Sequence, residues 1–200
     1  MLKVAVLVSG RGSNLQALMD ACAQTDFPAE IVTVISNIPD VFGLERASQA
    51  NIATAVVNHK EFDGRESFET ALQAAILQSD ADLICLAGFM RILTAGFVNR
   101  WRDRLLNIHP SLLPAFKGLH VHEQALAAGV KVSGCTVHFV VPDMDSGPII
   151  VQEAVPVLPG DNPDALAARI LEAEHRCYPQ ALRLIAEGRV EIAGDRTVIK

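Results

Sequence analysis

Short apolar runs alternate with amphipathic segments along the first half of the chain, and this alternation constrains the fold more than any other feature. The first run, residues 2–8, is apolar except for Lys3. A run of this length is typical of a strand that is buried on both faces, as in a parallel sheet. Apolar residues three or four positions apart predict the helices that lie between such runs. The predicted strands are 2–8, 31–36, 53–57, 82–87 and 105–109. One predicted helix begins at Ser13, and two more cover 39–50 and 62–78.

The last third of the chain follows a different pattern. Residues 131–141 and 149–155 alternate like a pair of antiparallel strands. A long helix over 163–187 follows, with a break expected near Pro179, and 190–192 is predicted as a last edge strand. Strands that alternate with helices form right-handed βαβ units with parallel strands. We therefore expect an α/β fold, a single-domain, open, mostly parallel twisted sheet of Rossmann-like type with helices on both faces and antiparallel strands toward the C-terminus.

Composition excludes several classes of protein. The formal net charge is -6 and no basic run is present, which argues against a nucleic-acid partner. The four cysteines are scattered without a Cys-x-x-Cys pair, which is typical of reduced thiols and not of a zinc site or disulfide framework. No signal peptide or membrane-spanning apolar run is visible. These features predict a cytoplasmic chain with no membrane partner.

A glycine-rich turn follows the first predicted strand. Gly10 and Gly12 precede Ser13 and Asn14, and Gln16 lies three residues after Ser13, which predicts a capping box at the start of a helix. A glycine turn that leads into a helix N-terminus suits a phosphate group. The spacing lacks the third glycine of the dinucleotide fingerprint, and no P-loop lysine follows. A phosphomonoester is one interpretation, and a well-capped helix that binds nothing is the other.

An Asn-x-His pair ends the strand predicted at 105–109. Asn107 and His109 point to the same side because side chains alternate in an extended segment. A neutral amide beside a proton carrier suits a reaction in which a carbonyl oxygen gains charge and a proton moves. Asp143 and Asp145 lie in a later turn-rich loop, where one of them either reaches His109 or only initiates the turn.

Three other groups of residues invite a functional reading, but from the residues alone we favour a structural one. The loop 89–93 combines apolar side chains with Arg91 and reads as a strand exit. His120 and His122 have no further ligands at metal-binding spacing, so no metal site is predicted. Glu172 and Glu174 read as part of a solvated helix face.

Four motifs together resemble the phosphoribosylglycinamide formyltransferases, folate-dependent enzymes of purine synthesis. They are Gly10-Arg-Gly-Ser-Asn-Leu-Gln-Ala17, Ala87-Gly-Phe-Met-Arg-Ile-Leu93, Leu106-Asn-Ile-His-Pro-Ser-Leu-Leu-Pro114 and Asp145-Ser-Gly-Pro148. The resemblance implies transfer of a formyl group from 10-formyltetrahydrofolate to the amine of glycinamide ribonucleotide. It also implies an N-terminal phosphate-binding half, about 1–100, and a folate-binding and catalytic half, about 101–200.

The resemblance also assigns roles to single residues. His109 would be the general acid, Asn107 would bind the formyl oxygen, and Asp145 would hold His109 protonated. The ribonucleotide would be bound by Gly12, Ser13, Asn14 and Glu174. The folate would be bound by Arg65, Met90, Arg91, Ile92, Leu93, Asn107, Val141, Asp143 and Asp145.

Three alternatives stay open at this stage. Water could accept the formyl group, as in a formyltetrahydrofolate hydrolase, or another amine could accept it. The chain could also bind a phosphate ligand without catalysis. We expect small-molecule partners and a monomer or weak homodimer.

Overall fold

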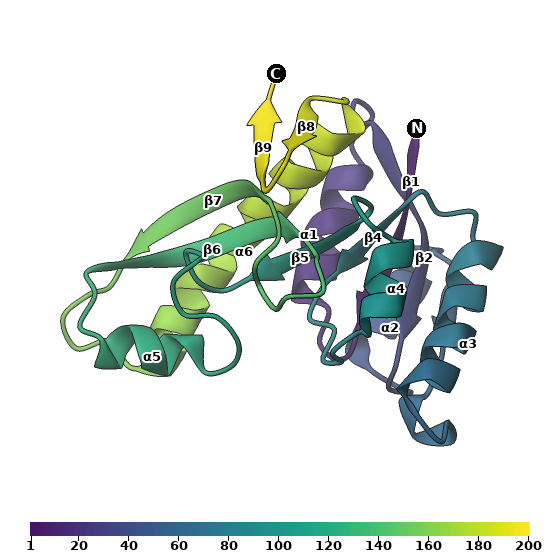
Figure 1. Cartoon of the computed structure of the whole chain (residues 1–200), viewed down its shortest axis with the longest axis horizontal. Coiled ribbons are helices and arrows are strands. Elements are labelled where there is room, and N and C mark those ends of the chain that lie inside the picture. Colours follow the sequence, from purple (N-terminus) through teal and green to yellow (C-terminus); the bar gives the residue numbers. More distant parts are fainter. The chain divides into compact units, whose positions relative to one another are not determined.

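The computed structural model describes all 200 residues and divides into two compact units, Met1–Leu106 and Asn107–Lys200. Hydrogen bonding orders seven strands as β3-β2-β1-β4-β5-β6-β7, and a separate pair, β8 and β9, forms a small second sheet (Figure 1). The pairs β1–β2, β2–β3 and β1–β4 are parallel, whereas β6–β7 is antiparallel. The predicted α/β fold with a mostly parallel sheet and antiparallel strands toward the C-terminus is therefore confirmed.

The first unit consists of repeated strand–helix pairs. Its elements are β1 (Leu2–Val8), α1 (Ser13–Cys22), β2 (Ala29–Ser36), α2 (Phe42–Gln49), β3 (Thr54–Val56), the short 3₁₀ helix η1 (His59–Glu61), α3 (Arg65–Gln78), β4 (Leu83–Leu86), α4 (Ala95–Arg100) and the start of β5 (Leu105–His109). Residues 4–8 of β1 are completely buried, as expected for a central strand that neighbours β2 on one side and β4 on the other.

The direction of the crossovers places helices on both faces of this sheet. The chain moves outward from β1 to β2 to β3, so right-handed connections put α1 and α2 on one face, where the two helices contact each other. The connection from β3 to β4 runs in the opposite direction and puts α3 on the other face. The carboxyl ends of the parallel strands therefore meet at one edge, where ligands bind in folds of this kind.

The second unit is built around one long helix and an antiparallel pair. Its elements are the end of β5, α5 (Val121–Ala127), β6 (Val132–Phe139), β7 (Ile149–Pro156), α6 (Pro163–Ala186), β8 (Val190–Ala193) and β9 (Arg196–Ile199). In Figure 1, α6 runs along β6 and β7, which it contacts. The helix begins at the cap residue Asn162, whose side chain accepts a hydrogen bond from the backbone N–H of Ala165 at 2.8 Å.

One detail of the predicted elements is wrong. Helix α6 continues through Pro179 without a break, because Tyr178, Ala181 and Leu182 bury their side chains around it and this packing outweighs the lost hydrogen bond. The strand predicted at 190–192 is confirmed as β8, which pairs with β9 in the separate two-stranded sheet.

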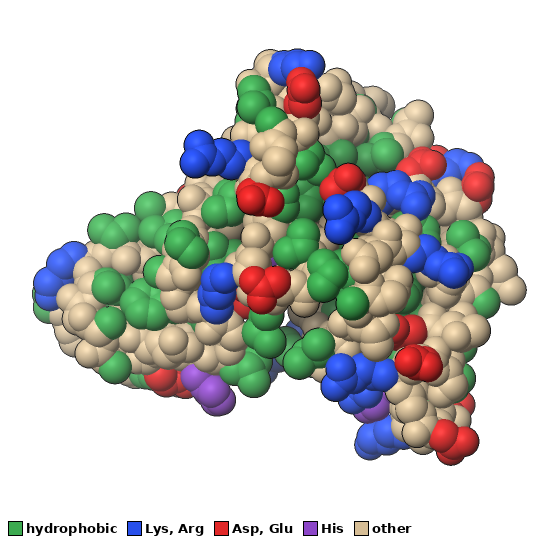
Figure 2. All heavy atoms as spheres, viewed as in Figure 1, with side chains coloured by type: hydrophobic (Ala, Val, Ile, Leu, Met, Phe, Trp, Pro, Cys, Tyr) green, Lys and Arg blue, Asp and Glu red, His purple; other side chains and the backbone are tan.

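The surface carries both signs of charge. On the face shown in Figure 2, acidic and basic side chains are interspersed and do not gather by sign. No helix of the chain is both long enough and apolar enough to cross a membrane.

Candidate active site

The turn between β1 and α1 is shaped by a close approach of two backbones. Gly12 has a left-handed backbone with φ 69°, and a Cβ at this position would lie 2.7 Å from the Cα of Gly43. The N–H of Gly43 donates to the carbonyl of Gly10 at 3.0 Å. Only glycine fits both the backbone angle and the contact at position 12. The turn is therefore fixed against the start of α2.

The start of α1 differs from the predicted capping box. Gly12 is the cap residue and no side chain caps the helix, so the prediction for Ser13 is wrong. The Gln16 amide instead donates to Asp20 at 2.8 Å, and its oxygen accepts from Arg46 at 2.9 Å. Gly12 has no side-chain oxygen that could accept from the first N–H groups of the helix. The arrangement keeps a polar helix N-terminus of the kind that binds anions.

The loop after β4 is anchored to β1. The buried hydroxyl of Ser9 accepts a hydrogen bond from the Met90 N–H at 2.8 Å and donates to Asn37 at 2.5 Å. The Met90 and Ile92 side chains are nevertheless exposed, at 72% and 63%. Arg91 and Leu93 are half-buried. A fixed backbone that presents apolar side chains to solvent suits a flat, partly apolar ligand.

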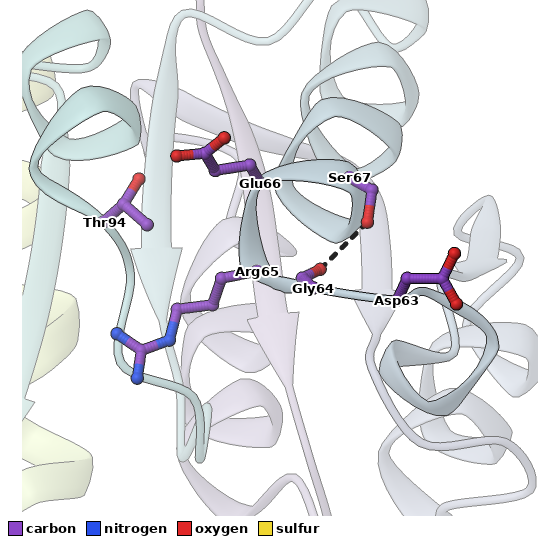
Figure 3. Close-up of a pocket in the computed structure, with 6 residues that line it drawn as sticks. All are labelled: Asp63, Gly64, Arg65, Glu66, Ser67 and Thr94. Atoms are coloured by element: carbon purple, nitrogen blue, oxygen red, sulfur yellow. Dashed lines mark hydrogen bonds between the residues drawn. The ribbon is translucent and has the colours of Figure 1, made fainter.

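Arg65 lies beside a broad depression at the start of α3. The depression has a volume of about 650 Å³ and is lined by Asp63, Gly64, Arg65, Glu66, Ser67 and Thr94. Figure 3 shows the side chain of Arg65 extending from the first turn of α3 toward the segment that carries Thr94. The backbone N–H of Thr94 donates to the buried carboxylate of Glu69 at 2.6 Å. This bond ties the end of the 88–94 loop to α3.

Asn107 and His109 lie on β5 with one residue between them, and their side chains reach the same cluster. His109 is buried, and Asn107 is half-buried. The ring Nε2 of His109 lies 2.9 Å from the carbonyl oxygen of Phe116, and Nδ1 lies 3.5 Å from the carboxylate of Asp145. Both ring nitrogens thus face acceptors, which suits the doubly protonated imidazolium form.

Asp145 is the residue of the later loop that reaches His109. The same carboxylate oxygen accepts a hydrogen bond from the Gly118 N–H at 2.9 Å. Asp143 and Val141 lie in the same loop, where Asp143 is exposed and Val141 is half-buried. A Cβ at Gly147 would lie 1.8 Å from the carbonyl oxygen of Phe139, so the loop returns to β6 through a contact that only glycine allows. This contact fixes the loop two residues after Asp145.

A second buried histidine was missed by the sequence analysis. His138, on β6, is 2% exposed, and its Nε2 lies 3.4 Å from the amide nitrogen of Asn107 and 3.9 Å from Asp145. Burial lowers the pKa of His138. The signal in the sequence is a histidine near the end of β6, whose other residues are Val, Ser, Gly, Cys, Thr and Phe. No group of three or more His, Cys, Asp and Glu side chains is arranged to hold a metal ion.

Glu174 does not lie on a solvated face. It is 6% exposed on α6, whereas Glu172 is exposed. The interpretation of Glu174 from the residues alone is therefore wrong. The helix is amphipathic, and Glu174 falls on its buried side between Ala173 and Cys177. A carboxylate in such a place needs a polar or charged partner.

Comparison with protein families gives one match that covers most of the chain. Residues 2–182 match the model of the family described as formyl transferase. A phosphoribosylglycinamide formyltransferase of Escherichia coli is 47% identical over 191 residues, which are 96% of this chain and 90% of that protein.

Longer proteins also contain a similar region. A trifunctional purine biosynthetic protein of Bos taurus is 53% identical over 190 residues, which are 95% of this chain but 19% of that protein. The chain spans between 14% and 19% of the length of the first trifunctional relatives it matches. Among solved structures, glycinamide ribonucleotide transformylase 1 from Symbiobacterium toebii superposes with a TM-score of 0.97 at 48% identity and covers 100% of this chain and 94% of that one.

Proposed function

Because this chain belongs to the formyl transferase family, we propose that it transfers the formyl group of 10-formyltetrahydrofolate to the amine of glycinamide ribonucleotide. The products are formylglycinamide ribonucleotide and tetrahydrofolate, and the reaction belongs to purine synthesis. The observation that carries this proposal is the cluster of Asn107, His109 and Asp145. High identity to relatives named for this activity supports it.

The chemistry of the cluster fits formyl transfer. Attack of the amine on the formyl carbon forms a tetrahedral intermediate whose oxygen carries negative charge. An N–H of Asn107 and the imidazolium of His109 stabilise this charge. The departing folate nitrogen gains a proton as its bond to the formyl carbon breaks. His109 is the general acid that supplies it from Nε2, whose N–H leaves the Phe116 carbonyl for the substrate.

Asp145 holds His109 in the charged form and also takes part in removing a proton from the attacking amine. Its negative charge lies 3.5 Å from Nδ1, where it stabilises the imidazolium. The attacking amine must also lose a proton. We infer that a water bound at Asp145 accepts it and relays it away from the reacting carbon.

The remaining residues bind the two substrates. Gly12, Ser13 and Asn14 hold the ribonucleotide phosphate at the N-terminus of α1. Glu174 contacts the glycinamide end, where its carboxylate complements an amine. The folate is bound by Arg65, Met90, Arg91, Ile92, Leu93, Asn107, Val141, Asp143 and Asp145. We propose that residues 1–200 act as one formyltransferase domain, without a metal ion.

One assay separates this function from hydrolysis. Tetrahydrofolate formation is followed by absorbance with and without glycinamide ribonucleotide, and formate is measured in parallel. We expect turnover only when the ribonucleotide is present, with no formate released. Formate release at the same rate without the ribonucleotide would identify a formyltetrahydrofolate hydrolase instead. A chain that binds both substrates without turnover would be a binding module.

A further inference from the structure

We propose that His138 is a positioning residue whose Nε2 accepts one amide N–H of Asn107 and thereby turns the other toward the formyl oxygen. This inference rests on the proposed function, because it concerns how the oxyanion donor is oriented. The inference is based on two contacts of the His138 ring, one at each nitrogen.

The first contact fixes the tautomer of His138. Its Nδ1 lies 2.9 Å from the backbone carbonyl oxygen of Phe139. A carbonyl oxygen only accepts hydrogen bonds, so Nδ1 carries the proton. In the neutral ring, Nε2 then has a lone pair and is an acceptor.

The second contact fixes the amide of Asn107. Its nitrogen, Nδ2, lies 3.4 Å from Nε2 of His138. If the amide were turned over, the oxygen of Asn107 would face the lone pair of Nε2, and two acceptors would repel each other. The tautomer of His138 therefore selects one of the two amide orientations.

The surroundings keep His138 neutral. Its side chain is 2% exposed, and loss of hydration lowers its pKa. The Phe139 carbonyl and Asp145 favour the charged form, whereas the charges of His109 and Lys117 oppose it. The nearest oxygen of Asp145, Oδ1, lies 3.9 Å from Nε2, too far for a hydrogen bond. Nε2 is thus left to Asn107.

The consequence concerns the second N–H of the same amide. Asn107 makes no other side-chain hydrogen bond within the protein. The two N–H bonds of an amide point in fixed directions about 120° apart, so anchoring one sets the other. A donor that is already oriented stabilises a developing oxyanion without reorganisation. Without the anchor, rotation would bring the amide oxygen toward the same negative charge.

Three substitutions at position 138 separate this role from a structural one. In His138→Gln, the longer amide reaches the place of Nε2 and its oxygen can accept from Asn107. In His138→Asn, the shorter amide reaches the place of Nδ1 and retains the bond to the Phe139 carbonyl alone. His138→Leu removes both contacts. Thermal melting confirms that each variant is folded before its kinetics are measured.

We expect the Asn and Leu variants to lose on the order of 100-fold in kcat while the KM values change little, since one oxyanion donor is worth about this much. The Gln variant should stay within about tenfold of the unsubstituted chain. If the His138→Asn variant kept its kcat and the His138→Gln variant did not, the bond to the Phe139 carbonyl would be the important contact, and the proposal would be overturned. A Leu variant with unchanged kcat would overturn it too.

A double substitution tests whether His138 acts through Asn107. In a chain that already carries Asn107→Ala, adding His138→Leu should lower kcat by less than about twofold, because the amide to be oriented is gone. If kcat fell further by as much as His138→Leu lowers it alone, His138 would not act through Asn107.

A measurement without turnover separates this inference from the proposed function. Nitrogen NMR of the chain with labelled histidine at neutral pH reports which ring nitrogen of His138 carries hydrogen. We expect hydrogen on Nδ1 alone. Hydrogen on Nε2, or on both nitrogens, would overturn the inference, whereas failure of the transfer assay with the expected tautomer would count against the proposed function alone.

Discussion

Asp145 and His109 meet with a carboxylate oxygen 3.5 Å from the ring Nδ1, although they lie on different elements of the second unit. The loop that carries Asp145 is tied at Gly118 and Gly147, so the carboxylate is held in place by backbone contacts on two sides. A charge held in this way stabilises an imidazolium without having to move during the reaction.

Asp145→Asn should remain folded and lose turnover. The amide oxygen can still accept from Gly118, but the negative charge beside His109 is gone. We expect kcat to fall by about 100-fold or more, the usual scale for general acid–base groups. Asp103→Asn is the matched control, because Asp103 is exposed and also has a left-handed backbone. An Asp145→Asn variant with an unchanged kcat would refute the pairing.

Asn107→Ala and His109→Ala should each reduce kcat by about 100- to 1,000-fold with little effect on substrate binding. The reason is that both side chains act on the charge that develops in the transition state. Stopped-flow turnover and equilibrium binding of a folate analogue measure the two quantities separately. Near-normal turnover of either variant at saturating substrate would remove that residue from the mechanism.

Glu174→Gln should weaken the binding of glycinamide ribonucleotide. We expect its KM to rise by about tenfold, since one charge-assisted hydrogen bond is lost, while the KM of the folate stays the same. Glu172→Gln, two residues away on the exposed side of α6, is the control and should behave like the unsubstituted chain. Equal effects of the two variants would exclude a specific contact at Glu174.

Gly147→Ala should destabilise the loop that carries Asp145. The added Cβ would lie 1.8 Å from the Phe139 carbonyl oxygen, so the backbone must shift. We expect a loss of about 1–3 kcal/mol in the free energy of unfolding together with a lower kcat. Gly96→Ala in α4 is the control, because the nearest atom to its Cβ would be the Thr94 hydroxyl at 3.7 Å. Urea unfolding of both variants measures the difference.

Because Asp161 pairs with Arg169, we expect the stability of the fold to fall at acid pH. Hydrogen bonds from Arg169 and the Leu158 N–H lower the pKa of Asp161 to about 2. Its contribution is complete above the ordinary carboxyl pKa of 3.8 and is lost as the pH falls toward 2. Asp161→Asn should lower Tm at pH 6 and make Tm less dependent on pH below 4. An unaltered acid dependence in thermal melts would contradict this assignment.

The parallel part of the fold was predictable because its strands are buried on both faces. Val4 to Val8 needed no tertiary information, since a continuous apolar run of that length has few other places in a protein. The glycine turn was predictable because Gly10 and Gly12 closely follow this run in the sequence. The cap residue of α1 was not predictable, because the backbone position of Gly12 depends on its contact with Gly43, far along the chain.

The site was predictable only where local geometry decides it. Alternation along β5 put Asn107 and His109 together, but no local pattern could choose between Asp143 and Asp145. That choice depends on how the loop returns to β6 at Gly147. The sequence did not single out His138, and from the residues alone Glu174 was placed on a solvated face, because burial of a polar side chain is a property of tertiary packing. The continuity of α6 through Pro179 also depends on tertiary packing, which the sequence does not show locally.

The left-handed backbone of Asp145, with φ 50°, restricts which acids can work at this position. Aspartate and asparagine tolerate this conformation better than longer or branched side chains. Glutamate would bear the backbone penalty and would also carry its charge one methylene further from the imidazole. Redesign of the loop that carries Asp145 therefore has only aspartate to use as the anion at this position, and must change its electrostatic effect through the neighbouring residues.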